Sequence, residues 1–496
     1  MLDVLVISRD SPFKTELLAT GVFKDDLISF NLSNISKRLE KTKQDLFLRG
    51  EFNAKFGKTY LLHSGDTELA RKILLVGLGN KQDFTPELAR ITAGKVTRMV
   101  KSLGLAEFSI FLTPKPSKEI VSAITEGIKL ANYSFNKYKT IKEPDSDKEI
   151  DKSYILVEDY DQTLVNVVNE SSIISESVNF ARDLGNLPPN ECSPAELAKI
   201  AAELSSSKIK VRTIETNELR SNQLNGIVSV GAGSSSPPKL IVIEYSGRKL
   251  GEVDFLILGK AVTFDTGGIS LKPSEKMEEM KFDKCGGCNV IAIMKALDRL
   301  TLPINVVGMI PAVENMPSGT SYRPGDIIRM HNGKTVEIAN TDAEGRIIMA
   351  DALSYGIHSY SPKAILDMAT LTGAAIIALG SNVAALLGND QELADKILSA
   401  ANLSGEKIWQ LPIFEEHKEQ IKSVVADIKN IGGRPAGAIT AAAFLSHFVG
   451  NTPWVHLDIA GTAWVQEGSI EKSYIFKGAT GFAVRTILKL LAHPKI

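Results

Sequence analysis

Two carboxylates and a guanidinium lie close together in the run from Asn340 to Arg346, which reads NTDAEGR. Side chains at positions i and i+2 of an extended backbone point the same way, so Asp342 and Glu344 could face one cation. Arg346 would then lie beside that cation and could bind an anion. A solvated acidic loop is the alternative, because such loops far outnumber metal sites.

A second group of polar residues follows a predicted strand further upstream. Residues 253–258 are largely apolar and predict a buried strand, and Lys260 and Asp265 come directly after it. Ligands of open α/β sheets bind at such strand ends, and the paired Gly267 and Gly268 allow the backbone to approach a bound group. Asp283 is a further acidic candidate, and a helical apolar pattern follows it to residue 300.

Together these segments supply enough negative charge for two divalent ions. The four carboxylates would balance four positive charges, and they belong to Asp265, Asp283, Asp342 and Glu344. Carboxylate-rich sites hold paired divalent metals roughly 3.5 to 4 Å apart, where the metals polarise a substrate group and activate a bridging water. The pattern therefore predicts metal-assisted hydrolysis.

Three cationic residues accompany the carboxylates. A lysine amine binds a metal only when it is neutral, and a nearby metal lowers its pKa enough to allow this, so Lys260 is a candidate ligand. An ordinary charged lysine at a strand end is the alternative. Lys272 and Arg346 are cations that could stabilise an oxyanion.

At these segments the chain resembles the leucyl aminopeptidase (cytosol aminopeptidase) family. The resemblance rests on the order and spacing of residues 259–273, 280–283 and 340–346. Further segments agree with it, namely residues 314–317 (ENMP), 322–326 (YRPGD), 369–374 (ATLTGA), 431–435 (IGGRP) and 457–464 (LDIAGTAW). The likeness covers roughly residues 180 to 485.

The resemblance implies a role for each matching position. One metal would be bound by Lys260, Asp265, Asp283 and Glu344, and the other by Asp265, Asp342 and Glu344, with Asp265 and Glu344 bridging. Lys272 matches the residue that helps to polarise the scissile carbonyl. Arg346 matches the residue that holds a bicarbonate ion, which would act as general base toward the bridging water.

The implied reaction is removal of the N-terminal residue from a peptide. One metal would hold the free α-amino group, which must be neutral, so we expect activity to favour alkaline pH. The first substrate pocket would include Met280, Thr370, Leu371 and Gly373, which suggests Leu, Met and other apolar residues at the substrate N-terminus. An apolar pocket discriminates by only about 1 to 3 kcal/mol per methylene, so specificity should be broad.

The resemblance also implies cofactors and an assembly. Two divalent ions per subunit are expected, Mn or Zn first and Mg or Co next, because oxygen-rich ligands accept all four. The family generally forms hexamers of paired trimers, which predicts a homohexamer.

The pattern of elements predicts an α/β fold with two domains. A smaller N-terminal α/β domain is expected over residues 1–160, a linker helix over 161–186, and a catalytic α/β/α domain with a central mixed sheet over 187–496. A polar stretch at residues 142–152 predicts an exposed loop. The Asn332-Gly333 pair predicts a hairpin turn that delivers the chain to Asn340 in extended form.

Composition excludes some classes of protein. The chain has 496 residues, 44% of them hydrophobic, and a formal net charge of −1, which suits two or three domains with substantial cores. No apolar run reaches the roughly 18 residues that span a bilayer, and the N-terminus has no basic region before its apolar stretch. We therefore expect a cytoplasmic protein without a membrane partner.

Other motifs carry weaker hypotheses. Cys285 and Cys288 spell C-x-x-C, but a structural zinc needs two further ligands, so a pair of buried thiols is expected and redox activity stays open. Asp265-Thr266-Gly267 matches the aspartic protease triplet, yet that class needs two copies. Gly77 and Gly79 give only a weak hint of a nucleotide turn.

A DNA-binding or other non-enzymatic role of the N-terminal domain is the alternative function. Residues 1–150 contain 24 Lys and Arg against 19 Asp and Glu, a small excess. No basic stripe with interleaved aromatic residues is visible there, which argues against a nucleic-acid partner.

Overall fold

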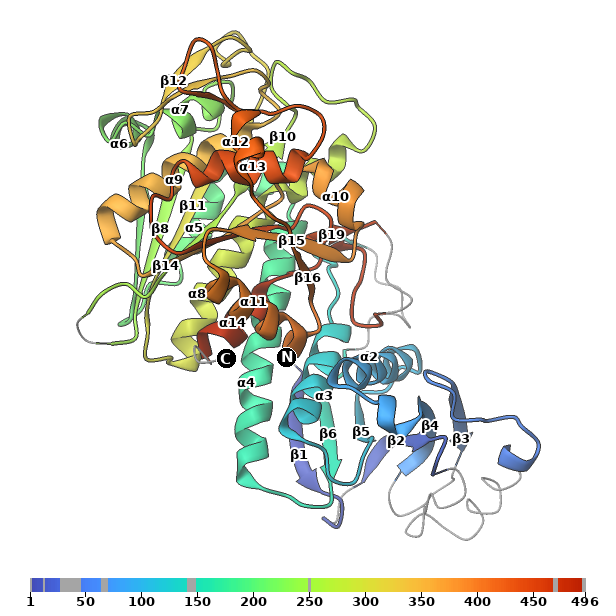
Figure 1. Cartoon of the computed structure of the whole chain (residues 1–496). Coiled ribbons are helices and arrows are strands. Elements are labelled where there is room, and N and C mark those ends of the chain that lie inside the picture. Colours follow the sequence, from blue (N-terminus) through green and yellow to red (C-terminus); the bar gives the residue numbers. More distant parts are fainter. Residues whose placement is uncertain are drawn as a thin grey trace. The chain divides into compact units, whose positions relative to one another are not determined.

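The computed structural model describes residues 2–11, 14–26, 46–63, 70–140, 149–248, 251–466 and 472–492. It divides into two compact units, Met1–Glu176 with Glu467–Phe476, and Ser177–Gln466 with Lys477–Ile496. The boundary falls inside one helix, α4 (Gln162–Asn186). Both units combine sheets with helices, so the predicted α/β fold class is confirmed (Figure 1).

The first unit is built on a six-stranded sheet with the order β1-β6-β5-β2-β4-β3 (Figure 1). All neighbouring pairs are parallel except β3 with β4. Its elements are β1 (Asp3–Ser8), β2 (Thr15–Phe23), β3 (Thr59–His63), β4 (Ala70–Gly79), η1 (Lys81–Asp83), α2 (Pro86–Ser102), β5 (Glu107–Phe111), α3 (Lys118–Ala131) and β6 (Lys152–Val157). The loop predicted over residues 142–152 lies mostly outside the described residues, and Lys152 begins β6.

Alternation along the strands gives this sheet two apolar faces. Leu74 and Val76 of β4 pack with the apolar residues of α2 and α3, whereas Ile73 and Leu75 pack in a separate cluster with Phe52. Successive strand side chains point to opposite faces, so each face buries its own cluster. Residues 3–8 and 152–157 lie side by side because β1 pairs with β6.

The second unit is built on a mixed sheet with the order β16-β15-β18-β14-β9-β11-β8-β7, to which β10 adds by pairing with β11. Its strands are β7 (Ile209–Ile214), β8 (Lys239–Ser246), β9 (Phe255–Gly259), β10 (Ala261–Asp265), β11 (Asn305–Asn315), β14 (Ala364–Ala369), β15 (Val383–Gly388), β16 (Lys407–Gln410) and β18 (Trp454–Asp458). Small sheets add β12 (Ile327–Arg329), β13 (Thr335–Glu337), β17 (Ile428–Lys429), β19 (Trp464–Val465) and β20 (Gly478–Ala479).

Helices cover both faces of the mixed sheet. Val307 and Met309 of β11 pack in the cluster that contains residues of α7, α9 and α13, whereas a Cβ on Gly308 would touch Val290 and Met294 of α8. The helices are η2 (Pro189–Glu191), α5 (Pro194–Ala202), α6 (Thr216–Ser221), α7 (Asn225–Gly231), η3 (Met277–Lys284), α8 (Cys285–Leu300), α9 (Glu344–Tyr360), α10 (Gly373–Leu379), α11 (Gln391–Ser404), α12 (Glu415–Glu419), α13 (Gly437–Ser446) and α14 (Val484–Ala492).

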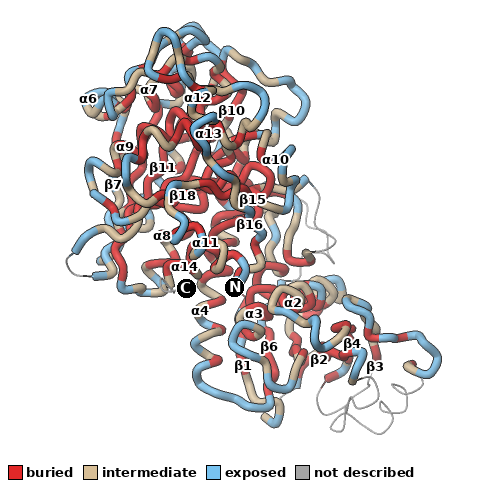
Figure 2. Tube along the Cα trace, in the orientation of Figure 1, coloured by how far each residue is buried: buried red, intermediate tan, exposed pale blue. Residues whose placement is uncertain are grey.

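The central strands are deeply buried, as the run of buried residues along β11 and β18 shows (Figure 2). Within the described residues, no helix combines the length and the apolar character needed to cross a bilayer.

The predicted hairpin is confirmed, but the backbone that follows it differs from the prediction. β12 and β13 pair antiparallel around Asn332-Gly333. Asp342 then lies in a turn and Glu344 is the first residue of α9, so the extended conformation predicted for this run is wrong. Asp342 N donates to the side chain of Asn340 at 2.7 Å, and such local bonds favour a turn before a helix.

Candidate active site

The candidate site lies where several segments of the second unit end. Lys260 separates β9 from β10, and both of these strands pair with β11. Asp265 is the last residue of β10. Asp283 lies near the end of η3, and Glu344 begins α9. Thr370 follows β14 directly, which is parallel to β9. Carboxyl ends of parallel strands meet at one edge of a sheet, which explains why distant segments converge here.

Tight backbone packing fixes the position of Lys260. Its N–H donates to Met368 O at 3.1 Å, and its carbonyl accepts from Gly287 N at 2.8 Å. A Cβ on Gly286 would lie 2.3 Å from Met368 O, so only glycine allows the start of α8 to approach this strand. The Gly286-Gly287 pair thus serves packing beneath the site.

Three of the four predicted carboxylates come together directly. One oxygen from each of Asp265, Asp342 and Glu344 lies within 4.8 Å of the other two. Asp283 joins through Lys260, whose Nζ lies 2.8 Å from Asp283 Oδ1, 2.8 Å from Glu344 Oε1 and 2.9 Å from Thr370 O. The structure therefore brings all five predicted metal-binding residues into one cluster.

Lys272 closes the other side of the cluster. Its Nζ lies 2.8 Å from Asp265 Oδ2 and also pairs with Asp342 Oδ1. Lys272 is partly exposed, with 21% of its side chain accessible, whereas Lys260 has 3%. The more accessible lysine is thus the one that a substrate could reach.

The cluster carries excess negative charge. Four carboxylates face two ammonium groups, so when all these groups are ionised the cluster has two more negative than positive charges. Burial alone would lower the pKa of both lysines, but the surrounding carboxylates raise it above the ordinary value. Burial, followed by the charges of Glu344 and Asp265, raises the pKa of Asp283 and of Asp342.

Two buried carboxylate oxygens also indicate that the cluster lacks cationic partners. Asp283 Oδ2 and Glu344 Oε2 are buried without a hydrogen-bond partner in the part of the chain that the structure describes. A buried acceptor without a partner costs about 1 to 3 kcal/mol, and more when it is charged. Divalent cations would supply both the missing partners and the missing positive charge, so the residues present fit such ions.

Arg346 lies near the cluster but forms no ion pair with it among the described contacts. Its Nη1 donates to Asn430 O at 2.8 Å, and its Nε is buried without a hydrogen-bond partner among the described residues. Burial lowers the pKa of Arg346 to about 10, so the guanidinium is still charged at neutral pH. A charged, buried donor without a partner is suited to an anion.

The predicted substrate-binding residues lie on two segments. Met280 is half-buried in η3, Thr370 and Leu371 lie in the link from β14 to α10, and Gly373 is the first residue of α10. Thr370 Oγ1 donates to Asp283 Oδ1 at 2.6 Å, which connects the two segments.

Four residues that the sequence analysis gave no role hold the site together. Asn315 Nδ2 donates to Asp265 Oδ1 at 2.9 Å and to Thr341 O at 3.1 Å. Thr341 Oγ1 donates to Gly267 O, and Asn430 contacts both Asn340 and Arg346. Asp458 accepts from Leu371 N at 3.1 Å and from the Thr372 hydroxyl at 2.6 Å. The signal that could have found Asn315, Thr341 and Asp458 is their presence in the segments that carry the family resemblance.

Residues 179–488 match the catalytic domain of the cytosol aminopeptidase family, and residues 19–142 match its N-terminal domain. The chain belongs to the cytosol aminopeptidase family. This confirms the resemblance, and it makes the protein a hydrolase of the aminopeptidase type.

Relatives and solved structures that resemble the chain cover 84% or more of it. A probable cytosol aminopeptidase of Cenarchaeum symbiosum is 48% identical, covering 84% of this chain and 85% of its own length. One of Roseiflexus castenholzii is 40% identical over 96% of both chains. A tomato leucine aminopeptidase mutant gives a TM-score of 0.87 at 30% identity, covering 99% of this chain and 97% of that chain. The bottromycin maturation enzyme BotP in complex with Mn gives 0.84 at 31%, covering 97% of this chain and 99% of that chain.

The two thiols of the C-x-x-C motif are buried within α8. Cys285 is 3% exposed and Cys288 is fully buried, and both are free. Burial raises the pKa of Cys285 to about 12 and also raises that of Cys288. These are the properties of inert packing residues rather than of redox-active thiols.

Proposed function

We propose that this aminopeptidase removes the N-terminal residue of peptides with two divalent metal ions held by the clustered side chains. Lys260, Asp265, Asp283, Asp342 and Glu344 would hold these ions. The convergence of Asp265, Asp342 and Glu344 oxygens within 4.8 Å carries this proposal. When bound, such ions polarise a carbonyl and activate water for attack.

The two lysines have different functions in this proposal, Lys260 in metal binding and Lys272 in stabilising the oxyanion. Lys260 must release its proton before its amine can bind an ion, and the ion supplies the positive charge that the ammonium group otherwise gives to Asp283 and Glu344. Lys272 faces the same carboxylates, and in the metal-free site they hold its pKa above the ordinary value despite burial. Its accessible ammonium group donates to the oxyanion that develops on the scissile carbonyl.

Arg346 supplies an anion site beside the cluster. Its Nε has no hydrogen-bond partner among the described residues, which supports the proposal that Arg346 would hold a bicarbonate ion, and this ion would supply a base for the attacking water. The carbonyl of Asn430 accepts from Nη1 and fixes the guanidinium in place.

Substrate choice rests on the link after β14 and on η3. We propose that Met280, Thr370, Leu371 and Gly373 line an apolar pocket for the first side chain, with Leu and Met preferred. Because the substrate amine binds when neutral, activity rises toward alkaline pH. We also propose that the protein is a homohexamer in the cytoplasm. Mn or Zn would be its metal, and Mg or Co could substitute. The Mn in the BotP complex supports the choice of Mn.

The test measures leucine release from leucine amide before and after chelation, and after each of Mn, Zn, Mg and Co is restored. We expect chelation to abolish turnover and Asp342→Asn to lower kcat/KM by at least about 100-fold. Asp395→Asn, an exposed change on α11, is the matched control and should leave turnover unchanged. Undiminished turnover after chelation and in Asp342→Asn would contradict the metal assignment.

A further inference from the structure

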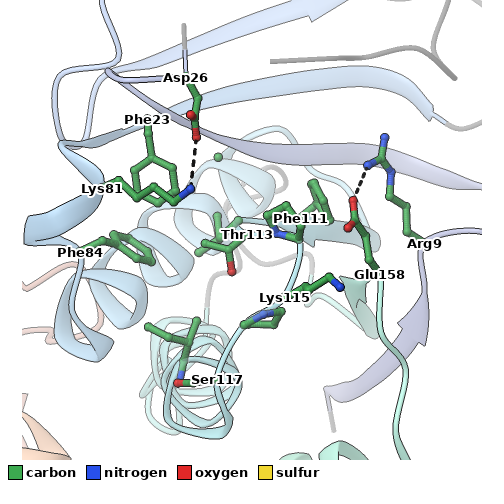
Figure 3. Close-up of a pocket in the computed structure, with 15 residues that line it drawn as sticks. Arg9, Phe23, Asp26, Lys81, Phe84, Phe111, Thr113, Lys115, Ser117 and Glu158 are labelled. Atoms are coloured by element: carbon green, nitrogen blue, oxygen red, sulfur yellow. Dashed lines mark hydrogen bonds and ion pairs between the residues drawn. The ribbon is translucent and has the colours of Figure 1, made fainter. Parts of the chain in front are cut away.

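The first unit contains a cavity of about 650 Å³ at the carboxyl edge of its parallel strands (Figure 3). Pockets for small ligands have about this size. Its lining residues lie at or just after the ends of all five parallel strands: Arg9 after β1, Phe23 in β2, Lys81 after β4, Phe111 in β5 and Glu158 after β6. Ligands of open α/β sheets bind at this edge.

The cavity also lies where the direction of the chain connections reverses. After β2, the chain continues to β3 and β4 on one side of it, whereas after β5 it continues through α3 to β6 on the other side. β2 and β5 are neighbours, and Gly21 and Leu112 from their ends line the cavity. A Cβ on Gly21 would lie 2.8 Å from Leu112 O. Such reversal points are the usual ligand crevices of this class of sheet.

One part of the lining is suited to an anion. Ser117 caps α3, a helix of 14 residues, and Lys115 and Ser117 both line the cavity. The first turn of a helix offers backbone N–H groups and a positive dipole end to anions. Lys115 pairs with Asp159, but both side chains are more than two-thirds exposed. Such a pair contributes little, so Lys115 can turn toward an anion at low cost.

Another part of the cavity lining is aromatic. Phe23 and Phe84 meet edge to face at 5.3 Å between ring centroids, and Figure 3 shows them beside Lys81. Arg9 lies over the ring of Phe111 at 4.9 Å and pairs with Glu158 at 3.3 Å. Flat aromatic surfaces favour stacking with a planar ring.

A polar group lies between these two parts. Thr113 Oγ1 is buried and has no hydrogen-bond partner among the described residues. In Figure 3 Thr113 lies between the Phe84 ring and Lys115. A ligand with a hydroxyl or ring nitrogen would satisfy this hydroxyl.

We infer that this cavity binds a mononucleotide, a function separate from the aminopeptidase site. The phosphate lies at the start of α3 beside Lys115, and Lys81, which lies beside the phenylalanine rings and pairs with Asp26 at 4.0 Å, adds to the positive charge of the cavity. The heterocycle lies against the phenylalanine rings, and the sugar lies near Thr113. The lining contains three cationic residues, Arg9, Lys81 and Lys115, and two carboxylates, Asp26 and Glu158. Its net charge is therefore positive, which favours a phosphate.

The test is isothermal titration calorimetry on the full chain with adenosine and uridine 5′-monophosphates. We expect at least one to bind with a Kd below about 1 mM, and adenosine and inorganic phosphate to bind at least about tenfold more weakly, because each lacks one half of the ligand. Lys81→Glu with Lys115→Glu should weaken nucleotide binding at least about tenfold.

The matched control is Lys72→Glu with Lys152→Glu, which makes the same charge change near the amino ends of β4 and β6, away from the cavity. It should leave nucleotide binding unchanged. Aminopeptidase activity should stay at the parent level in both double variants, which shows that they fold. The inference is overturned if neither nucleotide binds, if both double variants bind equally well, or if inorganic phosphate binds as tightly as the nucleotides.

Discussion

Gly345 is the residue at which α9 packs tightly against the side chain of Lys260. A Cβ at this position would lie 2.7 Å from both Cε and Nζ of Lys260, and 2.8 Å from its Cδ. These distances are shorter than van der Waals contact, so Gly345→Ala must displace the end of Lys260. That amine is held by Asp283, Glu344 and Thr370, and it cannot move without breaking one of these contacts.

The expected effect on stability is small and the effect on activity is large. Replacing glycine by alanine in a helix gains up to about 1 kcal/mol, and losing one charge-assisted hydrogen bond costs about 1.5 to 3 kcal/mol. With the full helix gain of about 1 kcal/mol, the free energy of unfolding should therefore fall by about 0.5 to 2 kcal/mol. Displacing Lys260, a metal ligand in the proposed function, should lower kcat/KM by about 100-fold, which is about 2.7 kcal/mol of transition-state stabilisation.

Gly356→Ala in the same helix provides the opposite case. Its Cβ would lie 2.5 Å from Leu256 Cδ2 and 3.1 Å from Met309 Sδ, inside the apolar core. Overpacking there should cost about 1 to 3 kcal/mol of unfolding free energy and leave kcat/KM of the folded protein unchanged. Urea unfolding and initial rates on leucine p-nitroanilide measure the two quantities. The reasoning fails if Gly345→Ala keeps kcat/KM within about twofold of the parent, or if both variants lose activity equally.

Three further outcomes are expected. Cys285 and Cys288 should resist a thiol reagent in the native protein and react only on unfolding, because burial raises both pKa values; rapid native labelling would contradict this. Asp458→Asn should lower the free energy of unfolding by about 1.5 to 3 kcal/mol and raise KM more than it lowers kcat, because this carboxylate positions Leu371 and Thr372; equal KM and stability would contradict it. Chelation should lower the melting temperature and Mn should restore it, since ions at 100 times their Kd stabilise the native state by about 2.7 kcal/mol; an unchanged melting curve would contradict metal binding.

Elements with a strong local pattern were predictable from the sequence. The turn predicted at Asn332-Gly333 is the one that joins β12 to β13 in the structure. β2 was missed, because its residues are buried on both faces and show no alternation that would identify a strand. The 3₁₀ helix η3, which carries Asp283, was also missed, since its sequence has no apolar period.

The convergence of the carboxylates was predicted for a partly wrong reason. An extended backbone was expected to align Asp342 with Glu344, yet one lies in a turn and the other begins a helix. They converge because Thr341 is held on both sides: its hydroxyl donates to Gly267 O, and its carbonyl accepts from Tyr322 at 2.7 Å. These partners are distant in sequence, and residue type alone does not identify them.

The two lysines explain how so acidic a cluster can belong to a stable fold. Each ammonium group contacts two carboxylates, so Lys260 and Lys272 together hold the cluster before any metal arrives. Removing one partner of a buried pair is costly, because it leaves an uncompensated charge. The lysines still leave an excess of negative charge, and this excess both raises their own pKa values and attracts divalent cations. The same imbalance that limits the stability of the apo site therefore provides the driving force for loading it with metal.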